Sequence, residues 1–204
     1  MKIICIGRNY VEHARELNNP VPEKPVFFLK PDTALLLRRH PFFYPDFSND
    51  IHFETELVLR ISQNGKHIQE KFAGRYYDAI GIGIDFTARD VQAECKKKGL
   101  PWEIAKAFDQ SAPVSEEFIP VSDIKDLKNI GFSMKINGKV RQEGNSNNMI
   151  FDFNRIIAYI SRFITLKTGD LIFTGTPEGV GPINIGDKVE AFIEDRKLLE
   201  FNVK

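Results

Sequence analysis

Cysteine is scarce in this sequence, since its 204 residues include only Cys5 and Cys95. This excludes a disulfide-rich secreted domain and fits a reducing compartment. Cys5 lies in a strand-like apolar run and Cys95 in a helical pattern. We therefore interpret both as packing residues rather than as a disulfide or a catalytic nucleophile.

Long hydrophobic runs are also lacking. The first ten residues, MKIICIGRNY, hold too short an apolar run for a signal peptide. The run AIGIGI at residues 79–84 falls far short of the ~20 residues that cross a bilayer. These absences predict no membrane segment and a cytoplasmic location.

Net charge is lacking too, because 28 basic residues balance 28 acidic ones. The balance argues against nucleic acid or an anionic membrane as a partner attracted by charge. The one basic run, Lys96 to Lys98, comes just before Gly99. We interpret it as the last turn of a helix, where positive charge complements the macrodipole.

The sequence is rich in short strand patterns. Its length suits one sizeable domain or two small ones. Hairpins are expected over residues 53–70 with a turn at Gly65, over 131–144 around Asn137-Gly138, and over 186–204. The pattern as a whole predicts an α+β, β-rich fold with about three helices.

Two further segments have a distinct pattern. Residues 79–85 alternate isoleucine with glycine, which predicts a strand whose bare face is closely approached by other atoms. Residues 87–99 predict a helix with a capping box of Thr87 and Asp90 and a stop at Gly99. Residues 149–166 carry the longest helical pattern.

Three carboxylates form the most informative cluster. Glu54 and Glu56 are two positions apart on an expected strand, so both point to the same face. Asp85 follows the strand over residues 79–85. A divalent cation would offset the repulsion and the desolvation cost of such a cluster. Oxygen-only ligands suit Mg²⁺, Mn²⁺ or Ca²⁺, and three of them leave positions open for water or substrate.

Other interpretations of these residues stay open at this point. Glu54 and Glu56 could lie on an exposed face while Asp85 caps a turn. His52 shares the face of the two glutamates, so a zinc site of His52, Glu54 and Glu56 is a competitor. A structural Ca²⁺ in a non-catalytic module is another.

A second cluster lies near the N-terminus. His13 and Glu16 have the i, i+3 spacing of one helix face, where a carboxylate could orient the imidazole as a base toward water. An ordinary exposed polar pair is the alternative. Lys106, between Trp102 and Phe108, could stabilise an anion, or its stem could extend from a core face to solvent.

The glycine-rich stretch TGTPEGVG at residues 174–181 is not a phosphate loop. It lacks the GxxxxGK[ST] spacing, and no Lys-Ser/Thr pair follows it. A turn whose amides receive a carboxylate remains possible, as does a plain tight turn.

Together these motifs resemble the fumarylacetoacetate hydrolase family. The resemblance covers nearly the whole chain in order, and it is strongest to the short single-domain branch of acylpyruvases that also decarboxylate oxaloacetate. It rests on GRNYVEHARE, FLKP, HFETELVL, residues 83–109, NGKVRQEG with MIFD, and TGTPEGVGPI. It implies one catalytic domain over residues 1–204, with a mixed β-sandwich roll and a few short helices.

The resemblance also implies roles for individual residues. The metal ligands would be Glu54, Glu56 and Asp85, holding Mg²⁺ or Mn²⁺, with Ca²⁺ as a possible substitute. The catalytic residues would be His13, Glu16 and Lys106, with the His13–Glu16 dyad on a lid segment. The substrate-binding residues would be Arg8, Lys30, Arg89, Gln92 and Thr176.

The activity implied by the resemblance is metal-dependent cleavage of a C–C bond in a small 2-oxo acid. An acylpyruvate would be hydrolysed by water activated by His13, with Lys106 stabilising the oxyanion at the distal carbonyl and a metal-bound pyruvate enolate leaving. Oxaloacetate would give the same enolate by losing CO₂. The alternative is an isomerase or hydratase of unsaturated 2-oxo diacids from aromatic catabolism. A homodimer is expected.

Overall fold

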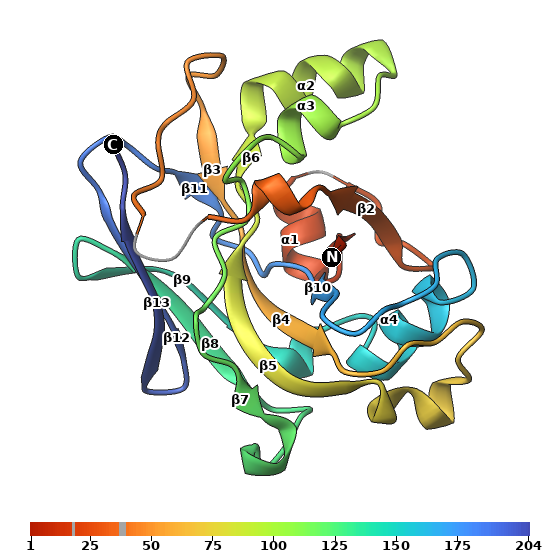
Figure 1. Ribbon diagram of the computed structural model, residues 1–204. Helices are drawn as coiled ribbons and strands as arrows, with labels where there is room; N and C mark the ends of the chain where they lie inside the picture. The colour runs from red at the N-terminus through yellow and green to blue at the C-terminus, as the bar shows by residue number, and fades with distance from the viewer. Residues whose placement is uncertain (18, 37–39) are drawn as a thin grey trace.

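The computed structural model describes residues 1–17, 19–36 and 40–204. Its largest sheet is a curved, six-stranded layer in the order β2-β1-β10-β4-β5-β7 (Figure 1). Only β1 and β10 pair in parallel, and the other neighbours are antiparallel. The strands are β1 (Ile3–Gly7), β2 (Val26–Lys30), β4 (Thr55–Ile61), β5 (Tyr77–Ile84), β7 (Ile119–Pro120) and β10 (Leu171–Phe173).

A four-stranded sheet packs against one end of this layer. Its order is β13-β12-β8-β9, so two hairpins join edge to edge through β12 and β8. The turn of the first hairpin has φ 53° at Asn137 and φ 76° at Gly138, as a type I′ turn requires. The strands are β8 (Gly131–Ile136), β9 (Lys139–Asn145), β12 (Lys188–Ile193) and β13 (Arg196–Asn202).

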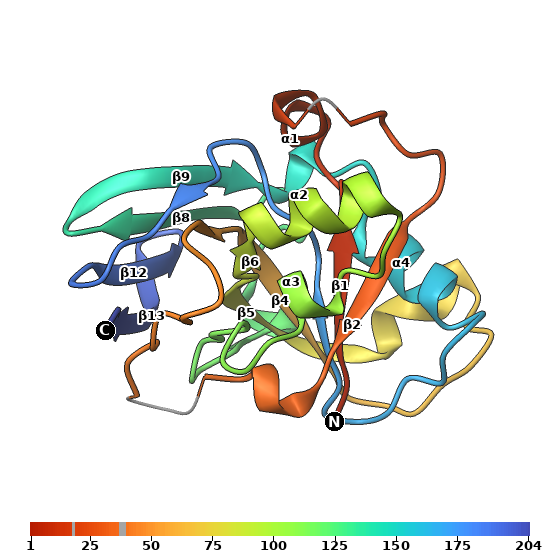
Figure 2. The same cartoon turned by 90° about the horizontal axis from the view of Figure 1, so that it is seen from above.

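Four α-helices lie outside the sheets in the part of the chain that is described: α1 (Val11–Glu16), α2 (Arg89–Lys98), α3 (Glu103–Lys106) and α4 (Phe153–Ile160). Both views show α2 and α3 side by side (Figure 1 and Figure 2). Figure 2 shows them over the side of the large sheet that carries β1 and β2, with α1 nearby. Gly99 ends α2 in the left-handed conformation, as expected.

A small third sheet connects these parts. It has the order β11-β3-β6, with β3 (Ile51–Phe53) between β11 (Gly181–Pro182) and β6 (Thr87–Ala88). Glu54 is the residue between β3 and β4, where the chain passes from the small sheet to the large one. This junction lies beside α2, which begins directly after β6.

The glycine face of β5 is packed as the sequence predicts. A Cβ on Gly83 would lie 2.5 Å from the ring of Phe173, and one on Gly81 would lie 2.4 Å from Ser115 Oγ. The isoleucines that alternate with these glycines, Ile80, Ile82 and Ile84, are fully buried in the main core cluster. The bare face therefore lets β10 and the following loops approach β5 closely.

Three local predictions were wrong. Residues 66–70 form no hairpin with β4, because Gly65 forms a bridge to Leu166 instead and β4 pairs with β5 and β10. The helix over residues 149–166 is cut to the eight residues of α4, so the ten-residue α2 is longer. The capping box of Thr87 and Asp90 is not formed. The N-cap of α2 is Ala88, which makes no side-chain hydrogen bond, and Asp90 accepts hydrogen bonds from Ser48 and Asn49 instead.

The α+β, β-rich class is confirmed, and the roll is made of one mixed sheet and two antiparallel sheets, with short helices outside them. Buried apolar side chains form one main cluster across the sheets and a smaller one around β1, β4 and β10. Among the described helices, none is long and apolar enough to cross a membrane.

Candidate active site

The three predicted carboxylates converge at one end of the β4–β5 pair. Thr55 is opposite Ile84 in the register, so Glu54 and Glu56 flank the point where Asp85 leaves β5. The Asp85 N–H donates to the Glu54 carbonyl at 2.8 Å. One oxygen from each carboxylate lies within 4.8 Å of the others, and all three residues are buried. An exposed face is therefore excluded for this cluster.

The two glutamates have opposite electrostatic environments. Burial raises the pKa of Glu54, but the charges of Lys106 and Arg89 outweigh it and hold the pKa well below its usual value. For Glu56, burial raises the pKa well above its usual value, and the charges of Asp85 and Glu54 raise it further. Its main compensation is the Gly175 N–H, which donates to Oε2 at 2.6 Å. The Glu56 carboxylate is thus compensated mainly by a backbone N–H and not by a cationic side chain in direct contact.

Two cationic side chains contact the cluster from the cavity side. The Lys106 ammonium donates to Glu54 Oε2 at 2.8 Å and to Asp85 Oδ2 at 2.7 Å. Arg89 donates to Glu54 Oε1 at 2.6 Å and to Gln92 Oε1 at 2.9 Å. Burial lowers the pKa of Lys106, but Asp85 and Glu54 outweigh it, so the net shift is upward and the ammonium stays charged.

Lys30 approaches the cluster from behind. Its ammonium lies 2.8 Å from Asp85 Oδ1, and it donates to Ser111 and to the carbonyls of Phe86 and Lys106. Lys30 is not among the residues that line the cavity. It fixes Asp85 and the backbone at Lys106, so its position does not favour the predicted contact with substrate.

The donor set fits a hard divalent cation. Three buried carboxylates with convergent oxygens form an oxygen-only group, and Glu56 lacks a full countercharge. Glu54, Glu56 and Asp85 would hold such an ion. His52 does not join them, because its Nε2 pairs with Asp50 Oδ1 at 2.9 Å. The geometry therefore gives no support to the zinc set that includes His52.

The predicted dyad is formed on α1. His13 Nδ1 lies 3.3 Å from Glu16 Oε2, and His13 is 5% exposed. Glu16 also accepts from the Gly179 N–H through Oε1 at 3.1 Å. One carboxylate thus orients the imidazole and connects α1 to the loop over residues 174–181.

The backbone amides of the glycine-rich loop at residues 174–181 donate hydrogen bonds to carboxylates, which is one of the two possibilities left open by the sequence. Its N–H groups receive carboxylates of this chain, Glu56 at Gly175 and Glu16 at Gly179. The loop therefore lies between the carboxylate cluster and the dyad and contacts both.

A cavity of about 40 Å³ joins these elements. The cavity is lined by the metal-ligand candidates, by His13 and Lys106, and by four of the predicted substrate-binding residues: Arg8, Arg89, Gln92 and Thr176. Glu16 and Lys30 stand behind this lining.

Sequence analysis missed Gln142, a buried residue of β9. Its Nε2 donates to Thr176 Oγ1 at 2.8 Å and to the Pro177 carbonyl at 2.9 Å, while its Oε1 accepts from the Thr55 N–H at 2.9 Å. Gln142 therefore connects the glycine-rich loop to Thr55, the residue between Glu54 and Glu56 at the start of β4. Its place within the NGKVRQEG motif was the only signal.

Asn9 was missed as well. It is fully buried, and its side chain bonds to the backbone of Phe151 in both directions and to the Thr174 carbonyl. A Cβ on Gly175, whose φ is 100°, would lie 2.6 Å from Asn9 Cβ. Asn9 thus fixes the chain that carries Arg8 and α1 against the loop.

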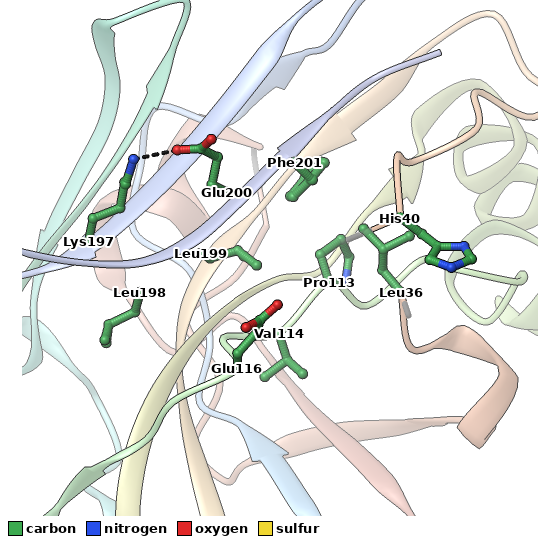
Figure 3. A pocket seen from close by; sticks show the side chains of 10 residues that line it. All are labelled: Leu36, His40, Pro113, Val114, Glu116, Lys197, Leu198, Leu199, Glu200 and Phe201. Atoms are coloured by element: carbon green, nitrogen blue, oxygen red, sulfur yellow. Dashed lines mark hydrogen bonds and ion pairs between the residues drawn. The ribbon is translucent and has the colours of Figure 1, made fainter. Parts of the chain in front are cut away.

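A larger cavity lies elsewhere, between β13 and residues 113–116 (Figure 3). Its volume is about 230 Å³, and Figure 3 shows Lys197 paired with Glu200 on one side and His40 on the other. None of the predicted site residues, all of which are described, lines it. The convergence of charged groups, not cavity size, distinguishes the candidate active site.

Comparison with known proteins identifies the family of this chain. The model of the fumarylacetoacetate (FAA) hydrolase C-terminal domain matches residues 2–204. The chain belongs to the fumarylacetoacetate hydrolase family. This confirms the family resemblance and the FAH-type fold that it implies.

Relatives within the family carry related names. The oxaloacetate tautomerase FAHD1 of Mus musculus is 46% identical over 202 residues, covering 99% of this chain and 91% of that protein. The oxaloacetate decarboxylase of Dictyostelium discoideum is 45% identical over 193 residues, covering 94% and 88%. The crystal structure of fumarylpyruvate hydrolase from Pseudomonas aeruginosa with Mn²⁺ and pyruvate matches with TM-score 0.92 and 36% identity, covering 100% and 89%.

Proposed function

We propose that this chain is a divalent-metal enzyme that converts small 2-oxo acids through their enol or enolate forms. The proposed reactions are hydrolysis of acylpyruvates and decarboxylation of oxaloacetate. The observation that carries the proposal is the position of His13 in one cavity with three buried carboxylates. A base next to a cation-binding cluster is what enolisation requires.

Each group has a part in this chemistry. Glu54, Glu56 and Asp85 would hold Mg²⁺ or Mn²⁺, which supplies Lewis-acid polarisation of the 2-oxo group when bound. Support comes from the relative whose crystal structure contains Mn²⁺ and pyruvate. Arg89 and Gln92 point from one face of α2 into the cavity, and Thr176 faces it from the loop, so these residues would orient the substrate.

His13 would transfer the proton. Glu16 holds Nδ1, so Nε2 serves as the base. In hydrolysis, His13 takes a proton from water as its oxygen adds to the distal carbonyl carbon. The C–C bond then breaks, its electron pair goes to the pyruvate fragment, and that carbon is protonated to give pyruvate. Lys106 would stabilise the oxygen that gains negative charge.

A second candidate function is keto–enol tautomerisation of oxaloacetate. The mouse relative named oxaloacetate tautomerase favours it. The same His13 would move a proton between the enol oxygen and the adjacent carbon, and no C–C bond would break. The isomerase alternative is less favoured, because the complete His13–Glu16 dyad suits water activation or proton transfer at a 2-oxo acid.

The experiment is a panel of 2-oxo acids with Mg²⁺, with Mn²⁺ and with a chelator. Pyruvate release from acetylpyruvate and from oxaloacetate reports C–C cleavage, and the ultraviolet signal of enol-oxaloacetate reports tautomerisation. We expect metal-dependent turnover of at least one, and no turnover of any would refute the proposal. The homodimer and the cytoplasmic location stay predictions, and light scattering in solution tests the first.

A further inference from the structure

The cationic residues that line the catalytic cavity fall into two groups. Lys106 and Arg89 are paired with the carboxylates of Glu54 and Asp85. Arg8 and Lys96 differ from them. Within the described part of the chain, neither has a carboxylate at ion-pair distance, and the one close contact of Lys96 is with the ring of Trp102. Two positive charges at the cavity thus have no carboxylate in direct contact among the described residues, and Glu54 acts on Lys96 only from a distance.

Lys96 reaches the cavity because of its helical position. Arg89, Gln92 and Lys96 are spaced i, i+3 and i+7 on α2, so they share one face, and all three line the cavity. The Lys96 ammonium lies 5.3 Å from the centroid of the Trp102 ring, which also lines it. Lys96 is exposed on its outer side, so it stands at the mouth of the cavity. Lys97, one position further, is not part of the lining.

Arg8 approaches from the opposite chain segment. It follows β1 with φ 60°, a left-handed conformation that is uncommon for a residue other than glycine. The fully buried side chain of Asn9 fixes the backbone directly after it. The backbone conformation that directs Arg8 to the cavity is therefore fixed by the buried hydrogen bonds of Asn9.

The two cations disfavour each other without a ligand. Burial lowers the pKa of Lys96, and the like charges of Arg89 and Arg8 lower it further. An anion between Lys96 and Arg8 would offset this repulsion and accept charge-assisted hydrogen bonds from both. The carboxylate triad lies deeper in the same cavity, so such an anion would sit at the outer end of a bound molecule.

We infer that Lys96 and Arg8 form a second anion subsite that binds the distal carboxylate of a dicarboxylic 2-oxo acid and selects it over a monocarboxylic one. This inference rests on the proposed function, which places the 2-oxo end of the substrate at the triad. Lys96 is then a specificity-determining residue. It also lies in the last turn of α2, as the basic run indicated.

The test uses the full chain with Mg²⁺ and two probes that differ only at the distal end, 2-oxoglutarate and 2-oxopentanoate. Their dissociation constants are measured by calorimetry for the wild type, Lys96→Gln, Lys96→Arg and Lys97→Gln. Lys96→Gln should weaken 2-oxoglutarate by about 5- to 20-fold, because one partly exposed charged contact is lost, and 2-oxopentanoate by less than about twofold. Lys96→Arg should restore most of the affinity.

Lys97→Gln makes the same change in net charge outside the cavity, so it should leave both probes within about twofold. Equal weakening of both probes by Lys96→Gln, or no weakening, would overturn the subsite. So would a wild type that turns over oxaloacetate but binds the two probes equally. A wild type that turns over no 2-oxo acid and binds neither probe would instead refute the proposed function, and the subsite with it.

Discussion

The ammonium of Lys106 lies 2.7 Å from Asp85 Oδ2 and 2.8 Å from Glu54 Oε2, between two of the three proposed metal ligands. A lysine and a divalent cation would therefore compete for the same oxygens. The cluster is built to receive positive charge, and the Lys106 ammonium supplies part of that charge here.

Replacing Lys106 tests this relationship. Lys106→Met keeps the length of the stem and removes the charge, so it should lower turnover at least about 100-fold, as for a lost oxyanion contact. Affinity for Mn²⁺, measured by calorimetry, should stay equal or rise, because a competitor is gone. A large loss of Mn²⁺ affinity in this variant would show that Lys106 supports the ion instead.

The dyad should affect turnover without affecting metal binding. His13→Gln should reduce kcat about 10²- to 10⁴-fold, the usual contribution of a general base, and leave Mn²⁺ affinity within about twofold. His52→Gln is the matched control, since His52 pairs with Asp50 and does not line the cavity. Equal kcat values for wild type and His13→Gln would remove His13 from the mechanism.

The proximity of the candidate catalytic residues could be predicted because it depends on local rules and on specific motifs. Strand alternation placed Glu54 and Glu56 on one face, and helix spacing placed His13 beside Glu16. Asp85 could be selected as a third ligand because it follows the strand pattern of alternating isoleucine and glycine. The antiparallel register of β4 and β5, which the sequence does not state, brings it to the glutamates.

The missed residues depend on long-range contacts. Gln142 is separated from Thr55 by 87 positions, so no window of sequence links them. The predicted hairpin over residues 53–70 is not formed for the same reason, because Gly65 pairs with Leu166 across the molecule. Lys96 was correctly assigned to the last turn of a helix, but only the packing of α2 beside the cavity shows that it also lines the cavity.

Gln142 should be important for stability as well as for the site. Gln142→Leu leaves the buried Thr55 N–H and the Thr176 hydroxyl without this partner, so the free energy of unfolding should fall by about 2 kcal/mol or more. Urea unfolding measures this loss. Gln63→Leu, at an exposed position, should change it by less than about 0.5 kcal/mol. Similar stability of both variants would contradict the account of Gln142.

Stability should also fall at high pH through Tyr77. Burial and the charge of Asp152 raise the pKa of Tyr77 to about 12 in the folded protein. In the unfolded chain, a tyrosine hydroxyl has a pKa of about 10. Between these values the unfolded state has lost the proton and the folded state has kept it. Stability therefore falls as pH rises, by up to about 1.4 kcal/mol per pH unit.

Urea unfolding of wild type and Tyr77→Phe from pH 8 to pH 11 measures this contribution. The phenylalanine variant should lose less stability above about pH 10, because it has no hydroxyl to ionise in the unfolded state. Parallel pH profiles of the two proteins would exclude Tyr77 as the source.

Glu54, Glu56 and Asp85 are proposed to hold one divalent cation, and Mn²⁺ titration by calorimetry tests this most directly. Glu56→Gln keeps an acceptor for the Gly175 N–H but removes the ligand charge, and Asp78→Asn removes an exposed carboxylate from the same pair of strands. We predict one Mn²⁺ per chain for the wild type and for Asp78→Asn, and at least about 100-fold weaker binding for Glu56→Gln. Unchanged Mn²⁺ affinity in Glu56→Gln would contradict the account.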